Sequence, residues 1–387
     1  MAIKTPFYKQ DQSEDFEAAP VSNATSYKPR HGLSIPAITV LDDNGCVIED
    51  EQRRVFRHLA QDGRGADIIF GIGTTGEWNR ISNDERRRLL WIQTDEYRRI
   101  NQEFAQRDLR PVESWVGVTS ASRRETLSNL ESALEAQADA AVIAPLSISD
   151  LSDVVGFFQK DVSDLFDHRG CSIPVFLYDN ADIAVDPRIP HLHTRDVKQL
   201  SRLSFISGLK VSASRRVLGN YTKGAGHFKD KTEFGIYIGN AMLMFQVFDF
   251  DSGFVGRFRE YWNRYLLHNE LPIGVVSGPA NVFPREWQRA WRACYAGDER
   301  LMSLYRSSFD DFGKSCQFRK QKRSIDKTIA CLKAGLKMDG VITSDEVAVG
   351  TPALDSEERS EFARRYSKIK DALANSTDGI WISKKEV

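Results

Sequence analysis

Residues 173–178 read IPVFLY and residues 205–211 read FISGLKV, and these two apolar runs decide the fold. Both are apolar at almost every position, which is typical of strands that are buried on both faces of a parallel sheet. Between them, Thr194 is suited to cap a helix that carries Val197 and Leu200. The segment therefore predicts one strand–helix–strand unit of a parallel sheet.

The same alternation of apolar runs and amphipathic stretches repeats along the chain from residue 33 onward. Ser82 and Ser122 each precede a Glu at the capping-box spacing, which marks the start of a helix. Eight such units over about 250 residues predict an α/β fold of the (β/α)8 TIM barrel type, with an open doubly wound sheet as the alternative. The other six strands are expected at Ile35–Leu41, Asp67–Ile72, Ser114–Val118, Ala140–Ala144, Phe234–Ile238 and Ile273–Val276.

The two ends of the chain differ from this alternating region. Residues 1–30 are polar, contain several prolines and show no period, so we expect an N-terminal arm or a disordered tail. The barrel is assigned to residues 31–284. Within it, the aromatic-rich segment 246–271 is expected to be an insertion that packs on the body or a neighbouring subunit, or that covers the active site. Strand signals stop after the barrel, and residues 285–387 are expected to form a C-terminal helical domain.

The composition argues against several classes of partner. Lys and Arg number 53 against 54 Asp and Glu, so no excess charge of one sign attracts nucleic acid or an anionic membrane. No apolar run approaches the roughly 20 residues that span a bilayer. The 5 cysteines show no metal-type spacing, and the N-terminus carries charges where a signal peptide is apolar. We therefore expect a cytoplasmic protein that binds neither nucleic acid nor membranes.

A glycine-rich turn follows the second expected strand. Residues 71–76 read GIGTTG and satisfy G-x-G-x-x-G, the fingerprint of dinucleotide sites. That fingerprint normally follows the first strand and opens a helix directly, whereas the helix here is expected to start only after Ser82. The alternatives are an ordinary strand–helix turn and a turn that binds a small carboxylate through its amides and the hydroxyls of Thr74 and Thr75.

Two polar side chains, Tyr178 and Lys210, end the two strands quoted first. Burying an unpaired ammonium is costly, so the pKa of Lys210 should fall and leave an amine that attacks carbonyl groups. Taken singly, a lysine that extends to water and a core tyrosine are the ordinary interpretations. All strands of a barrel end at one rim, so Thr74, Thr75, Tyr178 and Lys210 are expected to face one pocket. A phenol beside an imine is suited to move protons there.

At these residues the sequence resembles the dihydrodipicolinate synthase / N-acetylneuraminate lyase family, which are class I pyruvate-dependent aldolases. The resemblance runs from about residue 33 to 375 and rests on five motifs in the family's order. They are G-T-T-G-E at 73–77, the helix start ISNDER at 81–86, Y-D-N-A at 178–181 in place of Y-N-x-P, G-x-K at 208–210, and the G-x-I-S-x-x-x-N-x-x-P pattern at 274–284.

The resemblance implies a TIM barrel with a C-terminal helical domain, usually in homo-oligomers that are dimers or tetramers. It implies a Schiff-base lyase, either an aldolase or a dehydratase, that acts without a cofactor on pyruvate or a 2-keto-3-deoxy sugar acid. In this family Lys210 would form the imine, Tyr178 would relay protons, and Thr74 would complete the relay. Thr75 and Thr74 would bind the carboxylate of the keto acid. The other candidate substrate contacts are Gly73, Asp179, Asn180, Val276 and Ser147.

The sequence departs from the family where specificity is set. The Arg that follows the tyrosine by five positions in the synthase branch is Ile183 here, which argues against a role in lysine biosynthesis. The P-Y-Y segment, from which a neighbouring subunit lends a tyrosine, is Pro145-Leu146-Ser147, so the relay lacks its third hydroxyl or uses Ser147. Asp179 and Asn180 could bind the hydroxyls of a polyol substrate or cap their own turn.

Three functions therefore stand beside one another. A Schiff-base lyase with a small-molecule 2-keto acid as its partner is favoured. A catalytically altered member that only binds small molecules is the second, and a nicotinamide-dependent oxidoreductase is the third. His191 and His193 lie in a proline-flanked loop without a carboxylate cluster, so we expect no metal site and solvated imidazoles.

Overall fold

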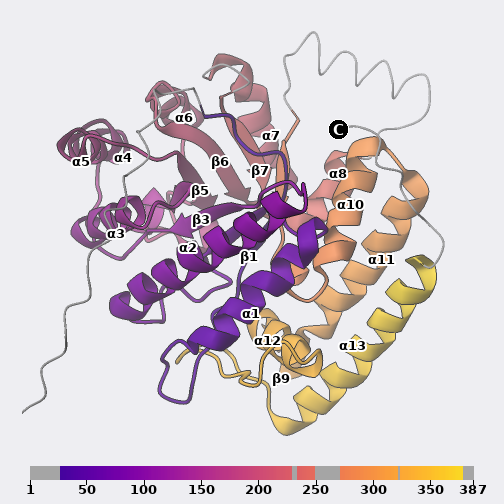
Figure 1. The fold of residues 1–387 in the computed structure, drawn as a ribbon. Helices are drawn as coiled ribbons and strands as arrows, with labels where there is room; N and C mark the ends of the chain where they lie inside the picture. The colour runs from indigo at the N-terminus through magenta and orange to yellow at the C-terminus, as the bar shows by residue number, and fades with distance from the viewer. Residues whose placement is uncertain (1–26, 229–232, 249–270, 321–322, 378–387) are drawn as a thin grey trace, which may run out of the picture.

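The computed structural model describes residues 27–228, 233–248, 271–320 and 323–377. Eight strands pair in chain order, and β1 pairs in parallel with β8, so the sheet closes into a barrel (Figure 1). This arrangement confirms the predicted TIM barrel and excludes the open doubly wound sheet. The strands are β1 (Gly32–Pro36), β2 (Ile68–Gly71), β3 (Glu113–Gly117), β4 (Ala140–Ile143), β5 (Val175–Asn180), β6 (Ile206–Ser212), β7 (Gly235–Ile238) and β8 (Gly274–Val276).

Helices alternate with the strands and cover the outside of the barrel (Figure 1). They are α1 (Glu49–Ala60), α2 (Asn83–Gln106), α3 (Arg123–Glu135), α4 (Val154–Gly156), α5 (Ser163–Arg169), α6 (Thr194–Leu200), α7 (Arg215–Gly224) and α8 (Met244–Val247). After β8 the described chain is mainly helical, with α10 (Pro284–Ala296), α11 (Glu299–Ser315), α12 (Thr328–Met338) and α13 (Ser356–Thr377), and with a hairpin of β9 (Gln317–Lys320) and β10 (Arg323–Asp326) between α11 and α12.

The starts of α2 and α3 follow the capping rule. The side chains of Ser82 and Ser122 each accept a hydrogen bond at 3.2 Å from the N–H three residues further on. These bonds satisfy amides that have no partner inside the helix. The start of α6 differs from the prediction by one residue, because His193 is its N-cap and Thr194 is already helical.

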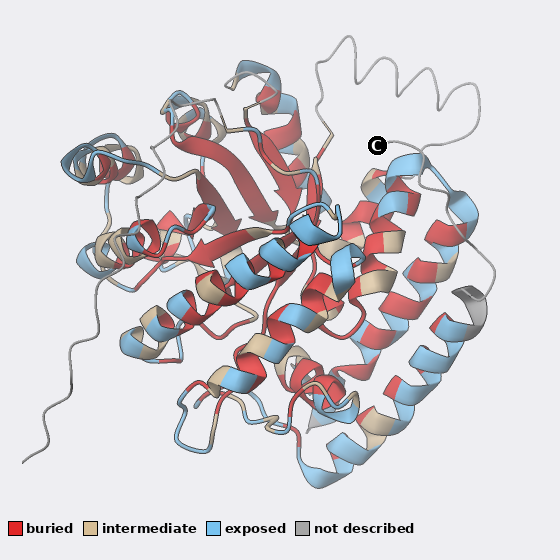
Figure 2. Cartoon of the chain, viewed as in Figure 1, coloured by how far each residue is buried: buried red, intermediate tan, exposed pale blue. Residues whose placement is uncertain are grey.

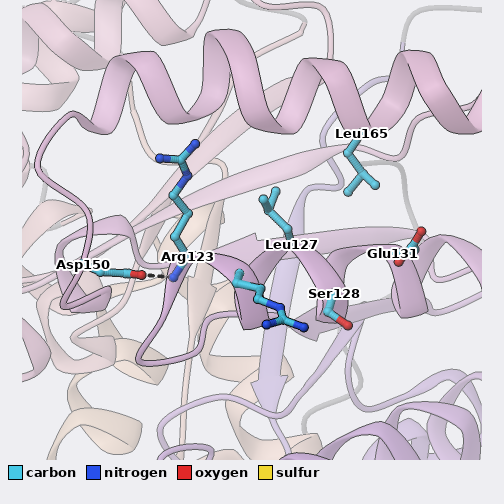
Figure 3. A pocket seen from close by; sticks show the side chains of 7 residues that line it. Arg123, Leu127, Ser128, Glu131, Asp150 and Leu165 are labelled. Carbon is cyan, nitrogen blue, oxygen red and sulfur yellow. Dashed lines mark hydrogen bonds between the residues drawn. The ribbon is translucent and has the colours of Figure 1, made fainter.

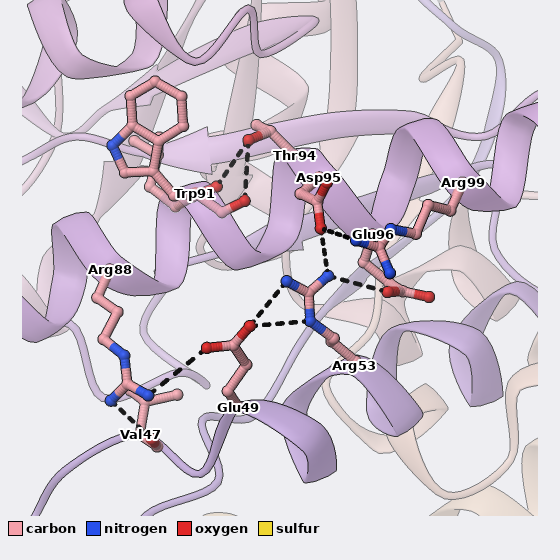
Figure 4. A network of polar contacts seen from close by, with 10 residues as sticks. Val47, Glu49, Arg53, Arg88, Trp91, Thr94, Asp95, Glu96 and Arg99 are labelled. Atoms are coloured by element: carbon pink, nitrogen blue, oxygen red, sulfur yellow. Dashed lines mark hydrogen bonds and ion pairs between the residues drawn. The ribbon is translucent and has the colours of Figure 1, made fainter. Parts of the chain in front are cut away.

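Helices α1 and α2 are joined by a polar network on the outside of the barrel (Figure 4). Arg53 of α1 binds Glu49 on its own helix at 2.8 Å and reaches Asp95 and Glu96 of α2 at 2.6 and 3.0 Å. One guanidinium thus holds three carboxylates. Because the network links several charges, it fixes the two helices better than isolated surface pairs would.

The barrel interior is a packed core rather than a channel. The rings of Trp115 and Phe176 stack with centroids 3.9 Å apart, and Tyr237 meets both of them edge-on. Figure 2 shows the strands and the barrel-facing sides of the helices as buried. The side chains of this interior cluster are Ile68, Phe70, Trp115, Ala140, Val142, Ala144, Phe176, Tyr178, Tyr237 and Val276.

The last residues of the predicted N-terminal arm are placed against one end of this core. Tyr27 donates a hydrogen bond to Glu113 at 2.7 Å and meets the ring of Phe176 edge-on. The hydroxyl of Tyr237 donates to the carbonyl oxygen of Arg30 at 2.6 Å. Residues 27–30 therefore cover the end of the barrel where the strands begin, and residues 1–26 of the predicted arm lie outside the described residues.

The C-terminal helices pack against the barrel and against one another through aromatic side chains. Trp287 of α10 and Phe309 of α11 stack with ring centroids 4.0 Å apart. Gln288 of α10 donates to Asp67, which precedes β2, at 2.9 Å. Phe248, at the start of the predicted insertion, packs edge-on against Trp291, and residues 249–270 of that segment lie outside the described residues.

The glycine of the G-x-K motif is required by packing, and its replacement gives a first prediction. A Cβ at Gly208 would lie 2.4 Å from the carbonyl oxygen of Gly235 and 2.7 Å from the ring of Phe176. We expect Gly208→Ala to lower the free energy of unfolding by about 1–3 kcal/mol, as overpacking does. Gly219→Ala is the matched control, because nothing lies within 4 Å of its Cβ and α7 should gain about 0.5–1 kcal/mol. Equal free energies of unfolding in urea for Gly208→Ala and Gly219→Ala would contradict the prediction.

Candidate active site

Tyr178 and Lys210 lie side by side at the ends of β5 and β6. The strand register pairs them directly. The Nζ atom of Lys210 lies 3.8 Å from the centroid of the Tyr178 ring and 4.9 Å from that of Phe70. Both Tyr178 and Lys210 are only 6% exposed. The structure therefore brings together, inside the barrel, the two residues that the sequence singled out.

The surroundings of Lys210 favour a neutral amine. Burial lowers the pKa of its ammonium, and the nearby Tyr178 opposes this shift only in part. A lysine with a lowered pKa holds a larger share of the free amine, which is the form that attacks a carbonyl carbon. The aromatic faces beneath Nζ can still stabilise a positive charge when an iminium forms there.

The hydroxyl of Tyr178 lies among three polar side chains. Its oxygen lies 3.0 Å from Nδ2 of Asn180, 3.3 Å from Oγ of Ser212 and 3.4 Å from Oγ1 of Thr74. Burial raises the pKa of this phenol, but the charge of Lys210 and the hydrogen bonds from Ser212 and Thr74 outweigh it, so the pKa is lowered. Tyr178 can therefore release and regain a proton more readily than an ordinary tyrosine.

The glycine-rich turn adopts a backbone conformation suited to anions. Ile72, with φ of 57°, and Glu77, with φ of 58°, both lie in the left-handed region that β-branched side chains rarely adopt. Such local strain is found mostly at functional sites. Within the described chain the N–H groups of Thr74 and Thr75 have no hydrogen-bond acceptor, whereas the Thr74 carbonyl accepts from Glu77 N–H. The residue that carries one of these N–H groups, Thr74, also places its hydroxyl 3.4 Å from the Tyr178 oxygen.

Glu77 anchors this turn to the C-terminal helices, a role that the sequence analysis did not assign. Its carboxylate binds Nζ of Lys333 at 2.6 Å, and the side chains of both residues are fully buried. It also accepts hydrogen bonds from Ala348 N–H at 2.8 Å and from the Thr351 hydroxyl at 2.6 Å. The signal in the sequence was Lys333 itself, a lysine between Leu332 and Ala334 in a helix whose other residues, apart from Thr328 and Lys337, are apolar or glycine.

Asp179 points away from Tyr178 and the barrel interior, since alternate residues of a strand face opposite sides. Its carboxylate accepts hydrogen bonds at 3.0 Å from Leu192 N–H and from the Tyr221 hydroxyl, and lies 3.0 Å from Nδ1 of His191. This fully buried carboxylate fastens the loop before α6 and α7 to β5. His191, predicted to be solvated, is engaged in this contact. Asn180, by contrast, faces Tyr178.

The remaining candidates lie around the same end of the barrel. Val276 belongs to the interior cluster that contains Tyr178, and Ile183 packs against that cluster. A Cβ at Gly73 would lie 2.8 Å from the Phe70 ring, so the turn passes directly over this ring. The hydroxyl of Ser147 is buried and has no partner within the described residues.

Two further hydroxyls were not predicted. Those of Ser34 on β1 and Ser277 after β8 are also buried without a partner in the described part of the chain. Both strands are neighbours in the barrel. A serine inside a buried strand, such as Ser34, is the sequence signal that could have drawn attention to them.

Other hollows lie on the outer helical layer. One of about 420 Å³ is lined by α3, α5 and the loop after β4, where Asp150 accepts from Arg123 N–H at 2.7 Å (Figure 3). Another of about 330 Å³ lies around His191 and Tyr221. Neither is lined by Lys210, Tyr178 or the threonines of the turn.

The described residues contain no group of three or more His, Cys, Asp and Glu side chains that could hold a metal ion. No described helix has the length and apolar character needed to cross a membrane.

No protein-family model and no curated protein matches the sequence. Solved structures, however, share its fold. A dihydrodipicolinate synthase from Bacteroides thetaiotaomicron aligns at 20% identity and a TM-score of 0.68, over 88% of this chain and 99% of that one. A prophage protein of the dihydrodipicolinic acid synthase family from E. coli K12, solved in complex with pyruvate, aligns at 19% identity and a TM-score of 0.67. The alignment covers 88% of this chain and 98% of that one. A sialic acid aldolase from Ruminococcus gnavus aligns at 14% identity and a TM-score of 0.68, over 89% of this chain and 98% of that one.

Proposed function

Because the chain has the fold of the dihydrodipicolinate synthase family at low identity, we propose that it is a divergent Schiff-base lyase of that family. Its substrate would be pyruvate or a larger 2-keto acid of the 3-deoxy sugar acid type. The observation that carries this proposal is the buried Lys210 amine, 3.8 Å from the centroid of the Tyr178 ring, beside a turn with free amide donors. Lys210 as nucleophile, Tyr178 as proton carrier and the donors of the turn could then all contact the same substrate molecule.

The chemistry would proceed as follows. The neutral amine of Lys210 attacks the keto carbon, and the resulting carbinolamine loses water to give an iminium. The iminium withdraws electrons from the neighbouring carbon, so a C–H or C–C bond there breaks to give an enamine. In the reverse direction the enamine adds to an aldehyde. No metal or other cofactor is required for these steps.

Thr74 and Thr75 would bind the substrate's carboxylate. Their N–H groups, which have no acceptor among the described residues, and their hydroxyls offer donors in a turn that contacts Tyr178 through Thr74. Donors fixed in advance bind an anion without the cost of ordering them, and they hold the keto carbon against the amine. A 2-keto acid fits this arrangement better than a simple ketone, which lacks the carboxylate.

The end of the site that receives the second substrate is less polar than the sequence suggested. Ile183 packs against the interior cluster in the position where the synthase branch has an Arg. Asp179, a candidate for polyol hydroxyls, has its carboxylate bound by three other groups. These contacts tie Asp179 to residues far along the chain. It is Asn180 that accepts from Asp182 N–H and so caps its own turn. Ser147 is left as a candidate polar contact for an aldehyde or a sugar chain.

A catalytically altered binding protein is the second candidate, because Ser147 stands where the family's tyrosine segment lies. A nicotinamide enzyme has less support, since the helix after the glycine-rich turn starts only at Asn83. Titration with NADH, followed by fluorescence, separates this class from the other two. We further expect a homo-oligomer in the cytoplasm, as proposed from the sequence.

The test is reduction with borohydride in the presence of pyruvate, followed by peptide mass spectrometry. We expect a reduced adduct on the peptide that contains Lys210, and none after Lys210→Ala. No adduct with pyruvate or with a panel of 2-keto-3-deoxy acids, on folded protein, would refute the proposal. An adduct without turnover on any aldehyde would favour the binding protein.

A further inference from the structure

In the family that the sequence resembles, a neighbouring subunit lends a third hydroxyl to the proton relay, from a P-Y-Y segment that is Pro145-Leu146-Ser147 here. Ser147 stands in that segment, but its Oγ makes no hydrogen bond within the described residues. Tyr178 is nevertheless surrounded by donors from its own chain. Donors to the Tyr178 oxygen determine toward which neighbour the phenol points its own proton.

Asn180 has only one orientation that satisfies its contacts. Its Oδ1 accepts a hydrogen bond from Asp182 N–H at 3.1 Å, at the start of the short helical turn 181–183. The other end of the amide, Nδ2, must therefore face the Tyr178 oxygen, 3.0 Å away. An NH2 group can only donate. Asn180 thus presents a donor to Tyr178 and stabilises negative charge on the phenol oxygen.

Ser212 approaches the same oxygen from the neighbouring strand. It lies two residues after Lys210, so both side chains project from the same face of β6. Its Oγ is 3.3 Å from the Tyr178 hydroxyl. Gly239 makes this position possible, because a Cβ there would lie 2.2 Å from the Ser212 oxygen. The absence of a side chain at Gly239 therefore leaves room for the Ser212 hydroxyl to contact Tyr178.

We propose that Asn180 and Ser212 are positioning residues that hold the Tyr178 oxygen by donation, so that Ser212, and not Ser147, supplies the missing hydroxyl. With Thr74 they would complete the relay from residues of a single chain. This inference rests on the proposed lyase function and extends it to how the proton carrier is held.

The step balances in protons. Tyr178 gives its proton to the hydroxyl of the carbinolamine, which leaves as water while the electron pair of nitrogen forms the C=N bond. The phenolate that remains is held by the donors of Asn180 and Ser212. It then takes a proton from the carbon next to the iminium, which yields the neutral enamine and restores the phenol. No oxidant or further reactant enters.

Two variants test the inference. Asn180→Asp keeps the acceptor for Asp182 N–H but replaces the donor to Tyr178 with a carboxylate oxygen, and Ser212→Ala removes the hydroxyl. The readout is exchange of the pyruvate methyl protons with deuterium, followed by NMR over a range of pH, together with borohydride trapping on Lys210. Asn44→Asp, at an exposed site, and Ser367→Ala, on the exposed side of α13, are the matched controls.

We expect both test variants to retain the borohydride adduct but to exchange at least about 10-fold more slowly, which is part of what a proton carrier contributes. The pH dependence of exchange should move to higher pH, because the phenolate loses donors; a role in folding alone would not move it. Controls should match wild type. Unchanged exchange in both variants, or loss in Ser147→Ala with none in Ser212→Ala, would overturn the inference. No adduct on wild type would instead overturn the proposed function and this inference together.

Discussion

Replacing Lys210 with methionine is expected to abolish turnover while making the fold more stable. Without the amine no covalent intermediate forms, and loss of a covalent nucleophile lowers kcat by about 10⁴-fold or more. The wild-type side chain is buried over the rings of Tyr178 and Phe70, where burial disfavours the ammonium. An apolar side chain of similar length removes that penalty, and we expect a gain of about 1–4 kcal/mol.

The gain should depend on pH. The folded pKa values of Lys210 and Tyr178 lie below their ordinary values of 10.5 and 10.0, so over the window up to about pH 10 the unfolded chain binds more protons. The contribution of these two groups to the stability of the wild type therefore rises with pH in that window. The penalty of Lys210 is full at lower pH and disappears as the pH rises through 10.5. The difference in free energy of unfolding between Lys210→Met and the wild type should therefore become smaller as the pH rises.

Urea unfolding at neutral and at alkaline pH measures both effects. Lys223→Met is the control, because that lysine is exposed on α7 and its replacement should change stability little at either pH. If Lys210→Met were less stable than wild type at neutral pH, the lysine would be a structural residue. The interpretation of Lys210 as a buried catalytic amine that costs stability would then be wrong.

Breaking the ion pair between Glu77 and Lys333 is expected to cost about 3–5 kcal/mol, the scale for leaving one buried charge without its partner. In Lys333→Met the Glu77 carboxylate keeps the hydrogen bonds from Ala348 and Thr351 but loses its counter-charge. The turn that carries Thr74 should loosen with it, so the affinity for a 2-keto acid should fall as well as the stability.

The matched control lies on the same helix. Lys337 pairs with Asp345 at 2.8 Å, but its side chain is 48% exposed. Lys337→Met should therefore cost about 1 kcal/mol or less. Unfolding in urea and equilibrium binding of pyruvate provide the comparison. Similar small costs for the two lysines would show that the buried pair does not hold the turn.

The fold and the centre of the site followed from the sequence because both depend on local pattern. Buried parallel strands leave apolar runs, and a polar residue at the end of such a run stands out, as Lys210 and Tyr178 do. The count of eight units favoured the closed barrel over an open doubly wound sheet, and the pairing of β1 with β8 decided between the two. The period of two along a strand also implies that Asp179 faces away from Tyr178, and this consequence was missed.

The rest of the site depends on contacts that no local pattern encodes. Glu77 and Lys333 are 256 positions apart, and any acidic residue could pair with any lysine at that separation. The left-handed conformation of Ile72 is imposed by its surroundings and contradicts its own preference. The place of Ser212 beside Tyr178 depends on the missing side chain of Gly239, which directly follows β7.

The ion pair of Glu77 also sets an order of events during synthesis. The ribosome releases β2 and the threonine turn long before it reaches α12, because Lys333 follows Glu77 by 256 residues. Until then Glu77 lacks the counter-charge of Lys333 and the hydrogen bonds from Ala348 and Thr351. Domains form from the N-terminus as the chain emerges. The contacts that anchor the threonine turn are therefore among the last to form, because they wait for α12 and the segment that follows it.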